Sequence, residues 1–234
     1  MKAIILCAGR GKRLSPLTDT MPKGMIKVNS IPLLIRNINL LIRRGFNIND
    51  IIVIIGYMEG IIRQYCALMI AKGAVFITQF RPDGTANAIN LAKEYIDRDF
   101  IVLSSDVIYE DDDIQKLMQI PNSLLYTKQK DRLEEYGTLD ISGMRIVKIN
   151  EKVTKPVSCF VNCGAYHFTP DIFDYIPKTE IDKRFNERII TNTINLMIQD
   201  KIGFIGIKID ELNEITYPED IEIVEKRLKE KGIE

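Results

Sequence analysis

Basic side chains gather just after the first apolar segment of the chain, together with two glycines. Segment 3–8 is apolar, Gly9 and Gly11 follow it, and Arg13 and Lys23 flank a Pro-Leu-Thr loop. Glycines let backbone N–H groups approach an anion closely, and Lys and Arg neutralise phosphate charge. If 3–8 is a strand of an open α/β sheet, these groups lie at its carboxyl end, where such sheets bind ligands. The stretch therefore predicts a phosphate-binding loop.

Two other phosphate motifs fail on single residues of this stretch. A dinucleotide fingerprint requires a third glycine where Leu14 stands, which disfavours a dinucleotide oxidoreductase. A Walker loop requires glycine at Leu6 and Ser or Thr at Arg13. Two interpretations stay open on these residues alone. Either the loop brings Lys23 back to the carboxyl end of the strand, where it helps to bind an anion, or the segment is a surface loop whose cations are solvated.

The whole stretch matches a longer pattern. AIILCAGRGKRLSPLTDTMPKGMIKV resembles LAAGxGxRLxPLTxxxPKxMxxV, the usual signature of the sugar-1-phosphate nucleotidylyltransferases, and departs from it at Cys7 (usually Ala) and Gly24 (usually Pro). The resemblance implies transfer of a nucleotidyl group from an NTP to a sugar 1-phosphate, with release of pyrophosphate and with Mg²⁺ as cofactor. It makes Arg13 and Lys23 catalytic residues. The nucleotide-binding residues that it implies in this loop are Ala8, Gly9 and Gly11.

The resemblance continues at the expected nucleobase and metal positions. QFRPDGTANAI resembles the family's base site, which implies that Gln79, Gly84 and Thr85 bind the nucleotide. Here a Pro-Asp-Gly turn precedes a helix. The free N–H groups at the start of that helix and the side-chain amide of Gln79 can hydrogen-bond the edge of a pyrimidine base. The resemblance implies that Asp106 is a catalytic residue and a metal ligand, because an Asp at its position binds magnesium in the family. Asp106 directly follows the apolar run 100–104, so its carboxylate can face the crevice of the sheet.

A third region resembles the family's sugar site. KINEKVTKPVSCFVNCGAYHF contains a Glu-Lys pair followed by an Asn-x-Gly strand. The resemblance implies that Glu151 accepts hydrogen bonds from sugar hydroxyls and that Lys152, a further catalytic residue, holds the sugar phosphate. It places Asn162 and Gly164 in the same pocket. Without the resemblance, Glu151 and Lys152 are a solvated charge pair.

The second metal ligand departs from the family pattern. Family members often carry an aspartate a few residues before a Thr-Pro-Glu-Asp helix start, whereas ELNEITYPEDI has Glu214 there and Tyr217 in place of the threonine. Glu214 is the expected second ligand, with Asp210 as the alternative. Together with Gly24, these departures leave open a catalytically weak subunit that senses nucleotide or sugar phosphate.

Composition excludes several other classes. The 234 residues include 32 basic and 32 acidic side chains, so no overall field favours nucleic acid or an anionic membrane. No stretch approaches the ~20 apolar residues of a membrane span. The four cysteines are scattered and suit a reducing cytosol, so we expect a cytoplasmic protein whose partners are small molecules. Because many members of the family self-associate, the resemblance leaves a homo-oligomer open.

Periodicity predicts an α/β fold with a doubly wound, mostly parallel Rossmann-like sheet. The expected strands of its first half are 3–8, 51–55, 74–78 and 100–104, with helices at 32–44, 58–71 and 85–95. A hairpin around Ser142-Gly143 starts an inserted β-rich sugar-binding sub-region. The later elements expected are a strand at 159–168, helices at 169–176 and 187–199, a strand at 202–208 and a terminal amphipathic helix from Pro218.

We expect one domain over 1–234. It divides into a nucleotide-binding part (1–136), a sugar-phosphate-binding part (137–215) and a terminal helix (216–234). Because the sequence ends after that helix, we do not expect the acetyltransferase extension of some longer relatives. Gln79 with Gly84 favours UTP or dTTP, while GDP-mannose and CDP-polyol or phosphocholine-type synthesis remain open.

Overall fold

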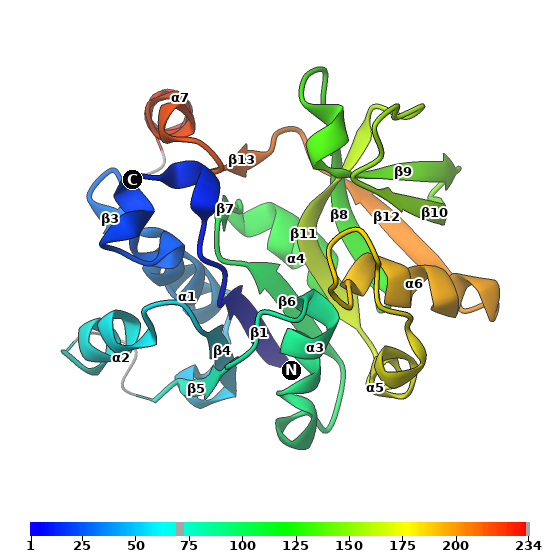
Figure 1. Cartoon of the computed structure of the whole chain (residues 1–234), viewed down its shortest axis with the longest axis horizontal. Coiled ribbons are helices and arrows are strands. Elements are labelled where there is room, and N and C mark those ends of the chain that lie inside the picture. The colour runs from blue at the N-terminus through cyan, green and yellow to red at the C-terminus, as the bar shows by residue number, and fades with distance from the viewer. Residues whose placement is uncertain (69–72, 233–234) are drawn as a thin grey trace.

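The structure is a computed structural model that describes residues 1–68 and 73–232. A nine-stranded sheet runs through this part of the chain (Figure 1). In spatial order its strands are β5 (Val75–Thr78), β4 (Ile51–Ile55), β1 (Lys2–Cys7), β6 (Phe100–Ser104), β11 (Phe160–Phe168), β8 (Ser123–Lys128), β12 (Phe204–Lys208), β10 (Arg145–Glu151) and β9 (Gly137–Ser142).

The first four strands in this order are parallel, as the alternating pattern predicts. β1 lies between β4 and β6, with Leu6 opposite Ser104 and Cys7 opposite Ile55. The pairing extends beyond β6, because the Ser105 N–H donates to the Leu6 carbonyl at 3.1 Å. The carboxyl ends of β1 and β6 therefore lie level, at the edge where the predicted phosphate loop begins.

The second half of the sheet is mixed. β11 runs antiparallel between β6 and β8, β12 is parallel to β8, and the predicted hairpin of β9 and β10 forms the far edge. The predicted α/β class and doubly wound sheet are confirmed, and antiparallel strands join this half to the parallel one. β8 is absent from the elements expected from sequence, since its apolar run is only three residues long.

Helices cover both faces of the sheet, because central parallel strands such as β4 and β6 are buried on both sides. The helices are α1 (Leu33–Arg43), α2 (Glu59–Leu68), α3 (Thr85–Asn90), α4 (Asp111–Met118), α5 (Ile172–Tyr175), α6 (Ile190–Gln199) and α7 (Pro218–Glu230). In β1, Ala3 and Ile5 belong to a buried cluster with α1, α2 and α4, whereas Ile4 packs with α3, α5 and α6. Of the helix expected at 58–71, residues 69–71 lie outside the described part of the chain.

Short strands and the terminal helix close the chain over the phosphate loop. β7 (Val107–Ile108) pairs with β13 (Asn213–Glu214), and β2 (Lys27–Val28) pairs with β3 (Ile31–Pro32). α7 packs on these short strands, in a buried cluster with Leu14. Within the described residues, no helix has the length and apolar character needed to cross a bilayer.

Candidate active site

Two adjoining cavities open at the carboxyl ends of β1 and β6. The smaller cavity, about 240 Å³, is lined by Lys23 and by five of the predicted nucleotide-binding residues, which are Ala8, Gly9, Gln79, Gly84 and Thr85. The larger, about 380 Å³, is lined by Arg13, Glu214 and the predicted sugar-phosphate residues: Glu151, Lys152, Asn162 and Gly164. Asp106 lines both. The fold therefore brings together residues that three separate segments of the sequence supply.

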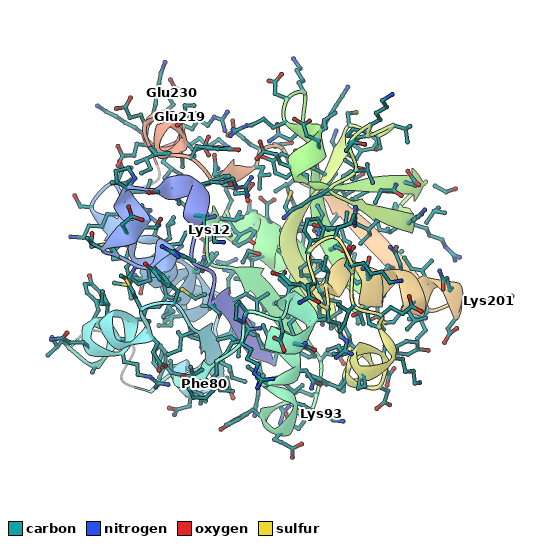
Figure 2. All side chains as sticks on the ribbon, viewed as in Figure 1. Lys12, Phe80, Lys93, Lys201, Glu219 and Glu230 are labelled. Atoms are coloured by element: carbon teal, nitrogen blue, oxygen red, sulfur yellow. The ribbon has the colours of Figure 1, made fainter. Side chains whose placement is uncertain are left out.

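Lys23 and Asp106 form an ion pair where the cavities meet. Lys23 Nζ lies 2.5 Å from Asp106 Oδ2, and both side chains are largely buried. Lys23 opens a 3₁₀ turn, Lys23–Met25, and the Gly11 backbone packs against its aliphatic stem. Because each charge is removed from bulk water, removing either partner leaves the other poorly compensated. Lys12, from the same loop, is instead exposed (Figure 2).

Asn37 on α1 holds the turn that carries Asp106. Its Nδ2 lies 3.4 Å from the carbonyl oxygens of Ser104 and Ser105 and 3.2 Å from that of Val107. Asn37 is 1 % exposed, so these contacts replace water around the carbonyl groups on both sides of Asp106. The sequence analysis did not identify Asn37, because its role depends on a tertiary contact.

Cys7 and Gly24, the two departures from the family signature, are in direct contact. A Cβ at position 24 would lie 2.2 Å from Cys7 Sγ, so the thiol occupies the space that any side chain there would need. The Gly24 N–H and the Ser105 hydroxyl hydrogen-bond the sulfur. Burial raises the pKa of the Cys7 thiol to about 12, and these hydrogen bonds lower it by less, so the group is neutral at physiological pH. Cys7 thus packs between the residues that neighbour Lys23 and Asp106.

The predicted base-binding turn is fixed by its own hydrogen bonds and by a later segment. Gln79 Nε2 donates to Asp83 Oδ1 at 2.9 Å and to the Gly84 carbonyl at 3.1 Å. Gly84 has a φ of 111°, and a Cβ there would lie 2.2 Å from the Arg188 carbonyl oxygen. Only glycine fits at this position. The Thr85 hydroxyl accepts from the Ile190 N–H at 3.0 Å, which ties the turn to the start of α6.

The acceptor groups of the predicted sugar site are already oriented. Glu151 Oε2 accepts from the Thr191 hydroxyl at 2.9 Å. Asn162 Nδ2 donates to the Tyr166 hydroxyl at 2.6 Å, and its Oδ1 accepts from the Gly164 N–H at 3.1 Å. These bonds fix the carboxylate and the amide at the wall of the larger cavity. Thr191 and Tyr166 were not singled out from the sequence.

Lys152 has an uncommon backbone conformation. Its φ is 44°, in the left-handed region that residues with a side chain seldom adopt, and its N–H donates to the Tyr136 carbonyl at 3.0 Å. Nζ lies 5.6 Å from the centre of the Phe185 ring, within cation–π range. Glu187 lines both cavities, and burial raises the pKa of its carboxyl while the Lys152 charge lowers it. Neither Phe185 nor Glu187 was identified from the sequence.

Glu214 reaches Asp106 through the pairing of β13 with β7. Glu214 lies opposite Val107, and the Ile215 N–H donates to the Asp106 carbonyl at 2.9 Å. Burial raises the pKa of the Glu214 carboxyl, and the charge of Asp106 raises it further, while Lys23 partly offsets both. Two carboxylates therefore share a site in which their charges repel.

This pair fits a magnesium ion. Mg²⁺ in phosphate-transfer sites is commonly held by one or two carboxylates, with substrate phosphates and water completing its oxygen ligands. Asp106 and Glu214 supply such a pair, and a divalent cation would relieve their repulsion. Within residues 1–68 and 73–232 there is no cluster of three or more His, Cys, Asp or Glu suited to a metal, so the protein alone provides an incomplete ligand set.

Arg13 also lines the larger cavity, against residues that the sequence did not connect with it. Its Nη1 pairs with the Glu135 carboxylate, and its guanidinium lies 5.4 Å from the centre of the Tyr217 ring. The Tyr217 hydroxyl donates to Glu135 Oε1 at 2.9 Å. Tyr217 thus replaces the usual threonine with a side chain that contacts Arg13.

We predict that Cys7 and Gly24 are energetically coupled. Gly24→Ala should destabilise the protein by about 1–3 kcal/mol, because its Cβ overlaps the thiol, and Cys7→Ala by about 1 kcal/mol. The double variant should lose less than the sum, since the methyl group fills the space of the sulfur. Urea unfolding of the four proteins measures the coupling. Gly203→Ala, where a Cβ would meet nothing within 4 Å, is the control, and additive losses would contradict the packing.

We also predict that Glu214→Gln raises the Tm in the absence of Mg²⁺ and reduces the stabilisation that Mg²⁺ gives. In EDTA the variant should have a higher Tm than the parent, because a buried carboxylate beside Asp106 is removed. Millimolar Mg²⁺ should raise the Tm of the parent and have less effect on the variant. Thermal denaturation followed by circular dichroism tests both statements. Glu222→Gln, at an exposed position of α7, should behave like the parent, and equal Mg²⁺ stabilisation of Glu214→Gln would exclude its role as a ligand.

The chain is similar to known proteins in sequence. Residues 2–208 match the family model described as Nucleotidyl transferase. The chain is 33 % identical to the bifunctional protein GlmU of Methanocaldococcus jannaschii. The aligned region covers 99 % of this chain and 55 % of that protein. It is 31 % identical to the UTP–glucose-1-phosphate uridylyltransferase AglF of Haloferax volcanii, covering 98 % of this chain and 97 % of that one. The chain thus spans about half the length of the GlmU relatives that it matches.

Solved structures share the fold. A UDP-glucose pyrophosphorylase complexed with UDP-glucose superposes with a TM-score of 0.82 at 20 % identity, over 98 % of each chain. The inositol-1-phosphate CTP transferase of T. maritima gives 0.80 at 16 % identity, over all of this chain and 97 % of that one. The family match covers far more than half of the sequence, and the fold agrees with it. This chain belongs to the nucleotidyl transferase family of enzymes.

Proposed function

We propose that this protein transfers a nucleotidyl group from an NTP to a sugar 1-phosphate and releases pyrophosphate. The observation that carries the proposal is the pair of adjoining cavities that share Asp106, one lined by the residues expected for the nucleotide and the other by those expected for the sugar phosphate. Family membership and the names of the relatives, among them a UTP–glucose-1-phosphate uridylyltransferase, support the same reaction class.

Electrostatics dominates this reaction, because both substrates are polyanions. Two like charges ~4 Å apart repel by about 4 kcal/mol at an effective dielectric constant near 20. Arg13, Lys23 and Lys152 carry the positive charge that offsets this repulsion: Arg13 and Lys152 line the larger cavity and Lys23 lines the smaller one. The second ionisation of a phosphate monoester lies near pH ~6, so the nucleophile needs no dedicated base at neutral pH.

The residues of the chain have separate tasks in the proposed step. An oxygen of the sugar phosphate attacks the α-phosphorus of the NTP, and the bond from that phosphorus to the pyrophosphate oxygen breaks. Lys152 and Glu151 hold the sugar phosphate, Lys23 neutralises the α-phosphate, and Arg13 binds the triphosphate. Rate enhancement then comes from positioning and charge stabilisation. A magnesium ion held by Asp106 and Glu214 would neutralise charge on the phosphate oxygens.

UTP or dTTP is the proposed nucleotide. Uracil and thymine present an N–H donor flanked by two carbonyl oxygens, a pattern that the Gln79 amide and the backbone at Gly84 complement. Because the hydrogen bonds to Asp83 and Gly84 fix the Gln79 side chain, its orientation is set before a base arrives. The relative named for UTP supports this choice, while the structural neighbour named for CTP makes cytidylyl transfer the second candidate.

Small molecules are the partners that this reaction requires. We propose a reducing, cytoplasmic setting, which the four free cysteines support, since a protein from an oxidising compartment would more often pair them. We keep the division into a nucleotide-binding part (1–136) and a sugar-phosphate-binding part (137–215) as part of the proposal, because the two cavities draw mainly on these segments.

An activity panel tests the reaction class and the substrates together. Purified protein with Mg²⁺ is mixed with each of UTP, dTTP, CTP, GTP and ATP, and with glucose, glucosamine, N-acetylglucosamine, mannose and inositol phosphates. We expect pyrophosphate release with UTP or dTTP and a hexose 1-phosphate. Nucleotide binding without pyrophosphate release from any pair would favour a sensing subunit, and preference for CTP would overturn the assignment of the base.

Loss of either member of the central ion pair should abolish turnover without unfolding the chain. We predict that Asp106→Ala and Lys23→Ala each lower kcat by about a hundredfold or more, because each removes charge from the reacting phosphates. Steady-state pyrophosphate release gives kcat, and circular dichroism checks the fold. The controls are Asp112→Asn on α4 and Lys27→Ala on β2, both exposed. Near-normal kcat in either active-site variant would remove that residue from the mechanism.

A further inference from the structure

Arg13 is engaged by the protein itself at the point where the proposed function requires it to bind a triphosphate. Its Nη1 pairs with Glu135 Oε2, and both residues line the cavity that contains Asp106. The Arg13 side chain is 44 % exposed and that of Glu135 is 22 % exposed, so an anion can approach the arginine from solvent. The carboxylate occupies one side of the guanidinium group that would otherwise face phosphate oxygens.

Glu135 is held from a second direction. Its other oxygen, Oε1, accepts from the Tyr217 hydroxyl at 2.9 Å. The Tyr217 ring contacts two guanidinium groups, Arg13 at 5.4 Å and Arg132 at 5.1 Å from its centre. Arg132 also binds Asp220 Oδ1 at 3.0 Å, while Asp220 Oδ2 accepts from the Tyr217 N–H at 2.8 Å. The ring is thus fixed at the start of α7, and Glu135 binds Arg13 through a rigid framework.

A triphosphate and Glu135 cannot both have full use of Arg13. A carboxylate and a phosphate compete for the same N–H donors of the guanidinium group. A triphosphate carries more negative charge than a carboxylate and so binds the arginine more strongly, but it must displace Glu135. A displaced Glu135 would still line the cavity, where its charge repels the phosphates.

We propose that Glu135 sets the affinity of this protein for triphosphates by competing with them for Arg13. Tyr217, which donates to Glu135, keeps the competing carboxylate in place. The inference rests on the proposed function, because it takes Arg13 as a triphosphate ligand. It goes further by assigning a role to Glu135 and to the tyrosine that stands where the family usually has threonine. The role predicts that removing the negative charge of Glu135 strengthens triphosphate binding.

The test is calorimetric binding of UTP and of inorganic tripolyphosphate to the full chain in the presence of Mg²⁺. Glu135→Gln should bind both ligands about fivefold more tightly than the parent, because an ion pair that competes with them is removed. Tyr217→Phe keeps the ring beside Arg13 and loses only the hydroxyl, so it should bind both more tightly by a smaller factor. If Glu135→Gln does not fold, Tyr217→Phe carries the test.

Glu134→Gln is the matched control, since it removes the same charge one residue away and Glu134 is exposed. The proposal predicts that Glu134→Gln binds like the parent and that Glu135→Gln gives much less tightening in an Arg13→Ala background than in the parent, because only direct charge repulsion is then relieved. Unchanged or weaker binding by Glu135→Gln would overturn it, as would equal tightening by Glu134→Gln.

Tripolyphosphate has no base and undergoes no nucleotidyl transfer, so this result is independent of the activity panel. A parent protein that binds tripolyphosphate but releases no pyrophosphate from any substrate pair contradicts the proposed reaction and leaves the competition to be judged by the variants. A parent that turns over, with no tightening in Glu135→Gln, contradicts the competition alone.

Discussion

The ion pair between Lys23 and Asp106 is the constraint on which the arrangement of the site depends. It joins the loop after β1 to the turn after β6, and the two strands are hydrogen-bonded in a register that makes their ends level. Asn37 binds carbonyl groups on both sides of Asp106, and Cys7 packs between the neighbours of the two charged residues. Two opposite charges held this closely need a rigid surrounding, and the buried cores on both faces of the sheet supply it.

Each cation expected to bind phosphate has a protein partner in the structure. Lys23 has Asp106, Arg13 has Glu135, and Lys152 lies against the ring of Phe185. Such partners lower the cost of concentrating positive charge in a site meant for polyanions. The chain as a whole has 32 basic and 32 acidic side chains, so its positive charge, like that of the site, is balanced by the protein itself.

The sequence was sufficient where local patterns determine structure. Buried parallel strands such as Ile51–Ile55 are continuous apolar runs, and the glycine-rich turn with Arg13 and Lys23 has a fixed spacing that carries the family resemblance. It was insufficient where a residue acquires its role by tertiary contact. Glu135 and Thr191 are distant in sequence from the side chains they bind, and nothing in their immediate neighbours distinguishes them from solvated residues. β8 was missed for a related reason, because three apolar residues are too few to establish a period.

The contact between Cys7 and Gly24 restricts the order in which these two positions could have changed. In the usual family signature a small alanine lies beside a proline, whereas here a thiol occupies the space that a Cβ at position 24 would take. If alanine and proline are replaced one at a time, a cysteine introduced first would meet the proline ring, whereas a glycine introduced first leaves only a small gap. The sterically permitted order therefore begins with glycine, and the thiol, once present, excludes proline at position 24. The glycine beside Lys23 and the thiol that fills its space are thus one paired replacement that neither position reveals alone.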